Sequence, residues 1–209
     1  MSDQETKNRI LDKALDHFLQ FGFSKVTMNE IAEDLGMSKK TLYQYFTGKE
    51  ELLLAVLNRM HTDTAVRIDA LIDDVQMDFP EKLRSILGIV ASFQARLTPH
   101  FLSDIQKHVP EAERCSDKFR NERMHQMTAR LLDEGVQKGI FRNDLPVDLI
   151  ALVYAGAVQT LLRPESLHQL SMQPSMAHAA VADVLFNGIL TAEGRTRLHP
   201  TSAPSAVPL

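Results

Sequence analysis

Residues 27–46 read TMNEIAEDLGMSKKTLYQYF, and this stretch predicts two short helices joined by a tight turn. Gly36 can end the first helix because glycine adopts the left-handed backbone conformation without a Cβ clash. Ser38 can cap the second helix because its hydroxyl accepts a hydrogen bond from a free N–H one turn further on. Ala32 is small where the two helices must approach closely. The apolar residues expected between these helices and the preceding one are Ile31, Leu35, Met37, Leu42 and Phe46.

Helical periodicity continues on both sides of this helix-turn-helix. Before it, one face of a helix that ends near Gly22 carries Ile10, Leu11, Ala14, Leu15 and Phe18. After it, helices are expected over residues 50–75, 81–97, 101–108, 111–139, 147–162 and 176–190. No segment alternates convincingly between apolar and polar residues, so no strands are predicted. The predicted fold is all-α.

Three parts are expected along the chain. Residues 1–48 form a three-helix domain that contains the helix-turn-helix, and residues 49–193 form a larger helical domain. Residues 194–209 contain spaced prolines and small polar residues, a composition typical of a disordered tail.

The charge of the chain gives no general indication of a nucleic-acid partner. The 209 residues carry a formal net charge of -4, and residues 1–60 hold eight Lys and Arg against nine Asp and Glu. Between Met37 and Lys49, however, there are three lysines and no acidic residue. A DNA-binding surface would therefore have to be a local basic strip.

The cellular context is expected to be the cytoplasm. Cys115 is the only cysteine, so no intramolecular disulfide can form. No apolar run approaches the roughly 20 residues needed to cross a bilayer. The N-terminus is polar and lacks the apolar core of a signal peptide.

The outer face of the second helix of the motif suits a major groove of DNA. Hydrogen-bonding groups, cations and an amphipathic ring lie on it, while flanking residues can reach phosphates. The full predicted DNA-binding set is Thr27, Met37, Ser38, Lys39, Lys40, Thr41, Tyr43, Gln44, Tyr45 and Lys49. The alternative is ordinary solvated surface, since a helix–Gly–helix corner occurs in many all-α proteins.

The stretch from Ile10 to Leu57 resembles the N-terminal domain of the TetR family of regulators. The matching elements are Ile10, Leu11, Ala14, Phe18, Gly22, Phe23, Thr27, Ile31, Ala32, Gly36, Ser38, Leu42, Tyr43, Phe46, Lys49, Glu50 and Leu52. Two positions depart from the family habit: Lys40 stands where many members have glycine, and Gly48 where a small polar residue is common. The resemblance implies a dimer, two DNA half-sites and regulation by a ligand.

The resemblance also implies that the last two helices form a four-helix dimer interface with a partner. The residues expected there are Leu149, Leu152, Val153, Gly156, Ala157, Thr160, Leu161, Ala180, Val184, Leu185, Gly188 and Ile189. Gly156 and Ala157 permit close helix approach. The alternative for any one of these residues is the internal core.

The middle helices are expected to enclose a pocket for a small, largely apolar effector, because methionines and aromatic rings accommodate apolar ligands. The proposed lining is Phe93, Leu97, Phe101, Leu102, Met124, Met127, Leu131 and Tyr154. Any single one of these residue types is more often ordinary core than pocket lining. His100, His108, Cys115 and His125 match no structural zinc spacing, so neither a metal nor a cofactor is predicted.

These features favour a ligand-responsive transcriptional regulator, a dimeric repressor that binds a palindromic operator and releases it when the effector binds. The effector would move the long helix after Lys49 and so change the distance between two recognition helices. A helical enzyme is one alternative, but no nucleophile–base pair, phosphate loop or close carboxylate pair is recognisable. A helical interaction module without DNA binding is the other, and sequence-selective, salt-dependent DNA binding would discriminate against it.

Overall fold

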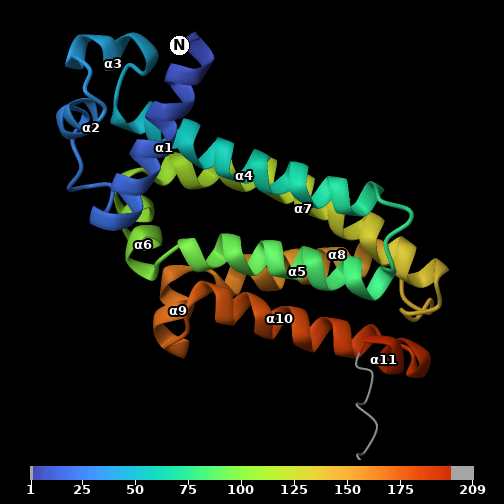
Figure 1. Ribbon diagram of the computed structural model, residues 1–209. Coiled ribbons are helices and arrows are strands. Elements are labelled where there is room, and N and C mark those ends of the chain that lie inside the picture. Colours follow the sequence, from blue (N-terminus) through green and yellow to red (C-terminus); the bar gives the residue numbers. More distant parts are fainter. Residues whose placement is uncertain (1, 199–209) are drawn as a thin grey trace, which may run out of the picture.

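The N-terminal domain consists of three helices at one end of the molecule (Figure 1). The structure is a computed structural model that describes residues 2–198, apart from the side chains of residues 111–122 and 198. The three helices are α1 (Asp3–Phe21), α2 (Met28–Asp34) and α3 (Lys39–Tyr45). A capping box between Ser2 and Glu5 begins α1, because each residue's side chain accepts from the other's backbone N–H.

The rest of the described chain is a helical body. Its helices are α4 (Lys49–Asp73), α5 (Phe79–Arg96), α6 (Pro99–His108), α7 (Pro110–Gln137), α8 (Val147–Leu161), α9 (Pro164–Leu170), α10 (Pro174–Ile189) and α11 (Ala192–Leu198). The long helices α4, α5, α7, α8 and α10 run along the body, with α6 at the end nearest the N-terminal domain (Figure 1). Over the described residues, the only pairing of β type is an isolated bridge between Phe141 and Leu190, so the all-α prediction is confirmed.

Two helices were not predicted from the sequence. Helix α9 buries only Leu167, so it has no apolar stripe for periodicity to detect. Helix α11 includes residues 194–198, where a disordered tail was expected, and this part of the expectation is wrong. A long-range contact places its start, because the N–H of Thr191 donates to the Ile140 carbonyl at 2.9 Å, and locally the Thr191 hydroxyl accepts from the Gly194 N–H. The remaining tail residues, 199–209, lie outside the described part.

The molecule has two principal hydrophobic cores, and α4 contributes to both. The first core fills the N-terminal domain and includes Leu52 and Val56 of α4 and Phe101 of α6. The second core fills the body and includes Ile68 and Ile72, near the other end of α4. The predicted domain boundary at residues 48 and 49 coincides with the start of α4, but the N-terminal core extends across it.

Gly135 allows close packing in the second core. A Cβ at this position of α7 would lie 2.2 Å from Cδ2 of Phe141 and 2.9 Å from Cζ of Phe79. The two rings are themselves packed edge to face, with centroids 5.5 Å apart. Because both rings are almost completely buried, neither can move aside easily.

We expect Gly135→Ala to lower the free energy of unfolding by about 1–3 kcal/mol, because overpacking outweighs the better helix propensity of alanine. The matched control is Gly88→Ala in the exposed middle of α5, where a Cβ meets nothing within 4 Å. This control should stabilise the protein by roughly 0.5–1 kcal/mol. Denaturant unfolding followed by circular dichroism measures both effects. Equal effects of the two substitutions would contradict the packing argument.

Candidate nucleic-acid interface and internal cavity

The turn between α2 and α3 is fixed by local hydrogen bonds. Thr27 and Glu30 form a capping box at the start of α2, and these hydrogen bonds hold the pKa of the Glu30 carboxyl below its ordinary value. Gly36 ends the helix with φ 66°, and the N–H of Met37 returns to the Ala32 carbonyl at 3.0 Å. Ser38 Oγ accepts from the Thr41 N–H at 3.0 Å and so caps α3. Gly36 therefore ends α2 and Ser38 caps α3, as predicted.

Helix α3 presents a polar face to solvent. Its apolar side is held by Leu42, which is completely buried in the N-terminal core. Lys39, Lys40, Tyr43 and Gln44 are exposed, and the Lys39 ammonium lies over the Tyr43 ring, 5.8 Å from its centroid. These four predicted residues thus lie together on an accessible surface, available to a binding partner.

The other predicted contacts of the motif have partners within the protein. Thr41 is half-buried, with its hydroxyl 2.8 Å from Ser38 Oγ. Met37 is half-buried and packs against the N-terminal core. Tyr45 also packs against this core, and hydrogen bonding to Asp3 raises its pKa. Their main contacts are therefore structural.

Lys49, which was expected at a DNA phosphate, has hydrogen-bond acceptors within the protein. Its ammonium donates to the carbonyls of Phe23 and Val26, both at 2.8 Å, and lies 3.3 Å from that of Ser24. It also lies over the Phe23 ring, 4.4 Å from the centroid. Partial burial lowers the pKa of Lys49. Lys49 therefore ties α4 to the loop that precedes α2.

Helix α6 contacts the same loop. The Asp104 carboxylate is buried and accepts a hydrogen bond of 2.8 Å from the Ser24 N–H. Burial opposes its ionisation, but the hydrogen bonds from Ser24 outweigh this effect, and the pKa of Asp104 lies below its ordinary value. Phe101 of α6 is 1% exposed and belongs to the N-terminal core.

A cavity of about 130 Å³ lies within the helical body. Its lining residues belong to α4, α5, α7, α8 and α10, and nearly all the exposed wall is apolar. Of the eight predicted lining residues, five lie on this wall: Phe93, Met124, Met127, Leu131 and Tyr154.

Leu97, Phe101 and Leu102 are not among the residues that line this cavity, and this part of the expectation is corrected. Leu97 packs against the N-terminal core and Phe101 is part of it, because α6 turns toward the N-terminal domain. The predicted lining also included no residue of α4, although Ile68 and Ile72 of that helix line the cavity. The helical spacing of Ile68 and Ile72 is visible in the sequence, but the sequence does not show what their face of α4 packs against.

Two polar side chains in the cavity wall are bonded to each other. The Tyr154 hydroxyl lies 2.5 Å from Nε2 of His178, and both residues are buried. Burial lowers the pKa of His178 to about 4 and raises the pKa of Tyr154. Both side chains are therefore neutral at pH 7. His178 was not predicted, although it lies on the apolar stripe of α10.

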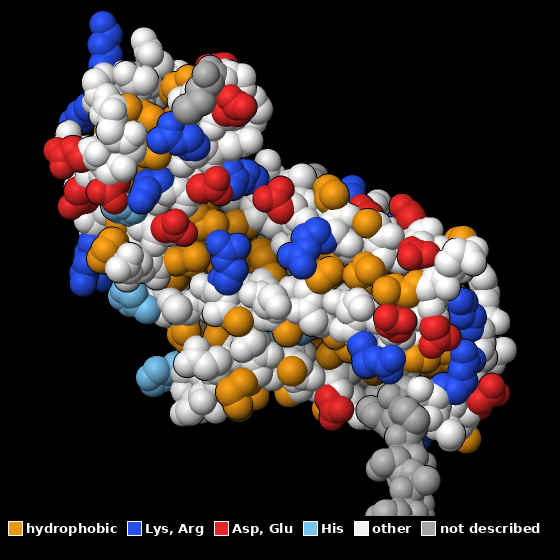
Figure 2. Space-filling model, viewed as in Figure 1, with side chains coloured by type: hydrophobic (Ala, Val, Ile, Leu, Met, Phe, Trp, Pro, Cys, Tyr) orange, Lys and Arg blue, Asp and Glu red, His pale blue; other side chains and the backbone are white. Residues whose placement is uncertain are grey.

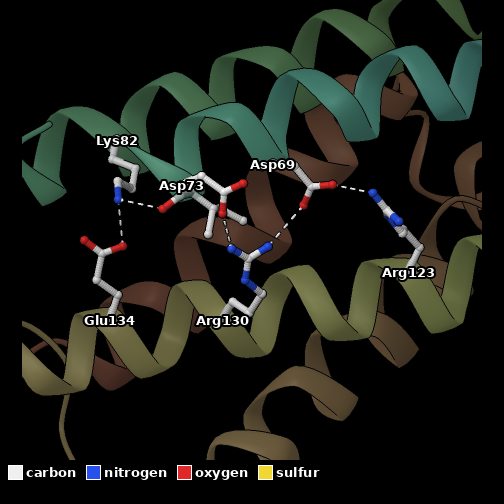
Figure 3. A network of polar contacts seen from close by, with 7 residues as sticks. Asp69, Asp73, Lys82, Arg123, Arg130 and Glu134 are labelled. Atoms are coloured by element: carbon white, nitrogen blue, oxygen red, sulfur yellow. Dashed lines mark hydrogen bonds and ion pairs between the residues drawn. The ribbon is translucent and has the colours of Figure 1, made fainter. Parts of the chain in front are cut away.

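Ion pairs connect α4 to α7 beside the cavity (Figure 3). Asp69 accepts hydrogen bonds from Arg123, which also lines the cavity, and from Arg130. Arg130 is also paired with Asp73. Arg123, the one Arg, Lys, Asp or Glu on the described part of the cavity wall, is thus paired with an acidic residue of α4.

A buried lysine extends this network to α5. Lys82 is 1% exposed, and its ammonium lies 2.8 Å from Glu134 Oε2 and 3.1 Å from the Ile72 carbonyl (Figure 3). Burial opposes ionisation of Glu134, yet the hydrogen bond from Lys82 lowers its pKa. The buried Lys82 ammonium of α5 is thus paired with α7 and hydrogen-bonded to α4, so it links three helices.

The predicted dimer residues divide between surface and core. Exposed positions on α8 and α10 are Leu149, Leu152, Val153, Gly156, Thr160, Ala180, Val184 and Gly188. Ala157, Leu161 and Leu185 are half-buried, and Ile189 is buried in the second core, so Ile189 is corrected to a core residue. Leu152 and Val184 are 65% and 76% exposed, unusually high values for large apolar side chains.

The histidines considered for metal binding lie apart from any cluster. His108 contacts Asp104, and His125 contacts Asp148, each at 3.5 Å. Among the residues whose side chains are described, no three His, Cys, Asp or Glu are grouped to hold a metal ion. The side chain of Cys115 lies outside the described part.

Within residues 2–198, no single helix is long and apolar enough to cross a membrane. Helices α8 and α9 satisfy the length and composition criteria only as a pair, and the chain bends by 76° between them.

Comparisons with known proteins identify the family. The sequence model of the bacterial regulatory proteins of the tetR family matches residues 10–56. The transcriptional regulator YvaF of Bacillus subtilis is 30% identical over 185 residues, which cover 88% of this chain and 96% of that protein. The repressor KstR2 of Mycolicibacterium smegmatis is 30% identical over 151 residues, 69% of this chain and 71% of that protein. The structure of SmeT, repressor of the Stenotrophomonas maltophilia efflux pump SmeDEF, aligns with a TM-score of 0.68, 18% identity and 97% coverage of both chains.

The chain belongs to the TetR family. It is a DNA-binding, ligand-responsive transcriptional regulator and not an enzyme. The predicted family, and the predicted function as a ligand-responsive transcriptional regulator, are thereby confirmed.

The buried His178 makes stability depend on pH. An unfolded histidine has a pKa near 6.5, so between pH 6.5 and about 4 the unfolded chain binds a proton that the folded protein excludes. Stability is therefore lost as the pH falls, by about 2 kcal/mol between pH 7 and pH 5.

Denaturant unfolding at both pH values measures this loss. We expect His178→Gln, which keeps a partner for the Tyr154 hydroxyl, to remove most of it. The control is His168→Gln at an exposed position of α9. A wild-type pH dependence in the His178 variant would refute the assignment.

Proposed function

We propose that the protein is a dimeric repressor that acts in the cytoplasm, binds a palindromic operator through α3 and leaves it when a small apolar molecule enters the cavity. The observation that carries this proposal is the exposed polar face of α3, which the caps at Gly36 and Ser38 hold in position. Repression is favoured because KstR2 and SmeT are both named repressors.

The proposed DNA contacts separate into two classes. Tyr43 and Gln44 offer a ring and an amide that suit base edges, while the cation of Lys39 suits a phosphate. Lys40 suits either a guanine or a phosphate. Figure 2 shows basic and acidic side chains close together on the visible face of the N-terminal domain. Because the domain has no general positive field, affinity is expected to depend on these few cations.

The proposed dimer contact is the exposed apolar stripe on α8 and α10. In a twofold symmetric dimer the same patch faces itself, so the stripes of two copies form a four-helix arrangement. Gly156 and Gly188 are exposed on these stripes, and a Cβ added at either position would meet nothing within 4 Å, which leaves room for another helix. Leu152 and Val184 supply apolar surface that lacks cover within the described chain.

The proposed release mechanism acts through α4. The cavity is lined by residues of α4, and Asp69 of α4 is paired with Arg123 on the cavity wall. An effector that displaces this wall shifts α4, to which the N-terminal domain is attached. The effector lowers operator affinity by its preference for the non-binding conformation, typically about 5–150-fold.

Lys39→Ala tests the DNA contact. We expect weaker operator binding and a salt slope lower by about 1 per half-site, if Lys39 contacts phosphate. Anisotropy titrations at several salt concentrations, on a duplex selected from a random pool, measure the slope. Lys49→Met is the matched control: it should lower stability by about 1–3 kcal/mol because three carbonyls lose their donor, and leave the slope unchanged. Equal weak binding to all duplexes would overturn the proposed function.

Leu152→Glu combined with Val184→Glu tests the dimer. The carboxylates would be buried without partners in the proposed interface, so we expect a monomer with greatly reduced operator affinity. Light scattering after size exclusion measures the mass. The control is Val66→Glu, which changes a 60% exposed valine on α4 outside the stripe and should leave the dimer intact. A dimeric double variant would exclude this face as the interface.

A further inference from the structure

Gln94 is a polar residue at a core position. It lies on α5 in the helical series Phe79, Leu83, Ile86, Val90, which faces the body, and it lines the cavity. Its side chain is only 7% exposed. Among the described residues, its Oε1 is the one buried side-chain oxygen or nitrogen atom that has no hydrogen-bond partner.

An unpaired buried acceptor is rare, because buried polar groups in folded proteins nearly always have partners. Several other polar groups of the cavity wall are already engaged, and Thr128, which also lines it, is only half-buried. The Thr64 hydroxyl donates to the Met60 carbonyl at 2.8 Å, Tyr154 is bonded to His178, and Arg123 is paired with Asp69. Gln94 is therefore the buried position where a bound molecule gains a hydrogen bond without breaking one of these contacts.

We propose that Gln94 recognises a hydroxyl group on the effector, and that the effector is a neutral, largely apolar alcohol or phenol. This inference rests on the proposed function of the cavity as the effector site. A hydroxyl suits the amide because it can donate to Oε1, and it can also accept if the amide turns its nitrogen inward. A carboxylate suits it less well, since an ionised acid cannot donate to Oε1 and its charge would be desolvated against an apolar wall.

The volume of the cavity limits the size of the molecule. About 130 Å³ is close to the roughly 150 Å³ of an engineered apolar cavity that holds benzene. A single substituted ring therefore fits with little movement of the wall. Larger members of the same class require the surrounding helices to separate.

Three compounds of similar shape test the proposal: 4-ethylphenol, 4-ethyltoluene and 4-ethylbenzoate. Calorimetric titration of the full-length protein should give binding of the phenol on the order of tenfold tighter than that of the methyl analogue, as one buried hydrogen bond provides. The benzoate should bind more weakly than the phenol. In Gln94→Leu the preference for the phenol should disappear, while the methyl analogue still binds. Gln126→Leu, at an exposed position of α7, is the control and should keep the preference.

The outcomes separate this proposal from the proposed function. Equal binding of phenol and methyl analogue, tighter binding of the benzoate, or a preference that survives in Gln94→Leu would each overturn the role of Gln94 but leave the effector cavity standing. Absence of binding by all three compounds would overturn the proposed class of effector. Operator binding measured on the same preparations independently reports whether the regulator itself is active. Unfolding measurements on Gln94→Leu establish that it folds, and removal of the unpaired amide should raise its stability.

Discussion

The membership of α4 in two hydrophobic cores is the constraint on which the rest of the structure depends. Leu52 and Val56 pack in the N-terminal core, whereas Ile68 and Ile72 pack in the core of the body. The helix has 25 residues, so it is about 37 Å long at 1.5 Å per residue. Because its backbone hydrogen bonds make it stiff, movement of its cavity end is transmitted to the other core. A connecting helix of this kind couples two sites without a flexible linker between them.

The loop before α2 connects the helices of the body to the DNA-binding motif. Lys49 of α4 donates to carbonyls of Phe23, Ser24 and Val26, and Asp104 of α6 accepts from the Ser24 N–H. Two helices of the body therefore hold the same few residues. Since α2 and α3 follow directly, the direction of α3 depends on both helices. A shift of α4 relative to α6 would strain these hydrogen bonds or rotate the motif.

The sequence predicted best those features that depend on near neighbours. Gly36 and Ser38 act on residues within one helical turn, so their caps could be expected from spacing alone. The contacts of Lys49 and Phe101 join segments far apart in the chain, and residue type does not reveal their partners. Lys49 was expected at a phosphate because it follows the second helix of the motif closely in sequence. Gln94 had a detectable signal, a polar residue in an apolar series, but only the structure shows that its oxygen lacks a partner.

The cavity wall is largely apolar and includes Gln94, whose Oε1 is a buried acceptor without a partner. The apolar wall and this acceptor affect a ligand's action on α4 in different ways. A hydrogen bond from the ligand to the Gln94 amide stabilises every conformation in which the two meet. This hydrogen bond therefore adds to the affinity for the ligand but does not by itself couple ligand binding to operator binding. Coupling requires that the ligand fit one conformation better than another. The small volume of the cavity supplies such a difference, because a molecule larger than about 130 Å³ favours a body with its helices further apart. In this arrangement Gln94 selects the chemistry of the effector. The packing of Ile68 and Ile72 against the effector determines how far α4 moves.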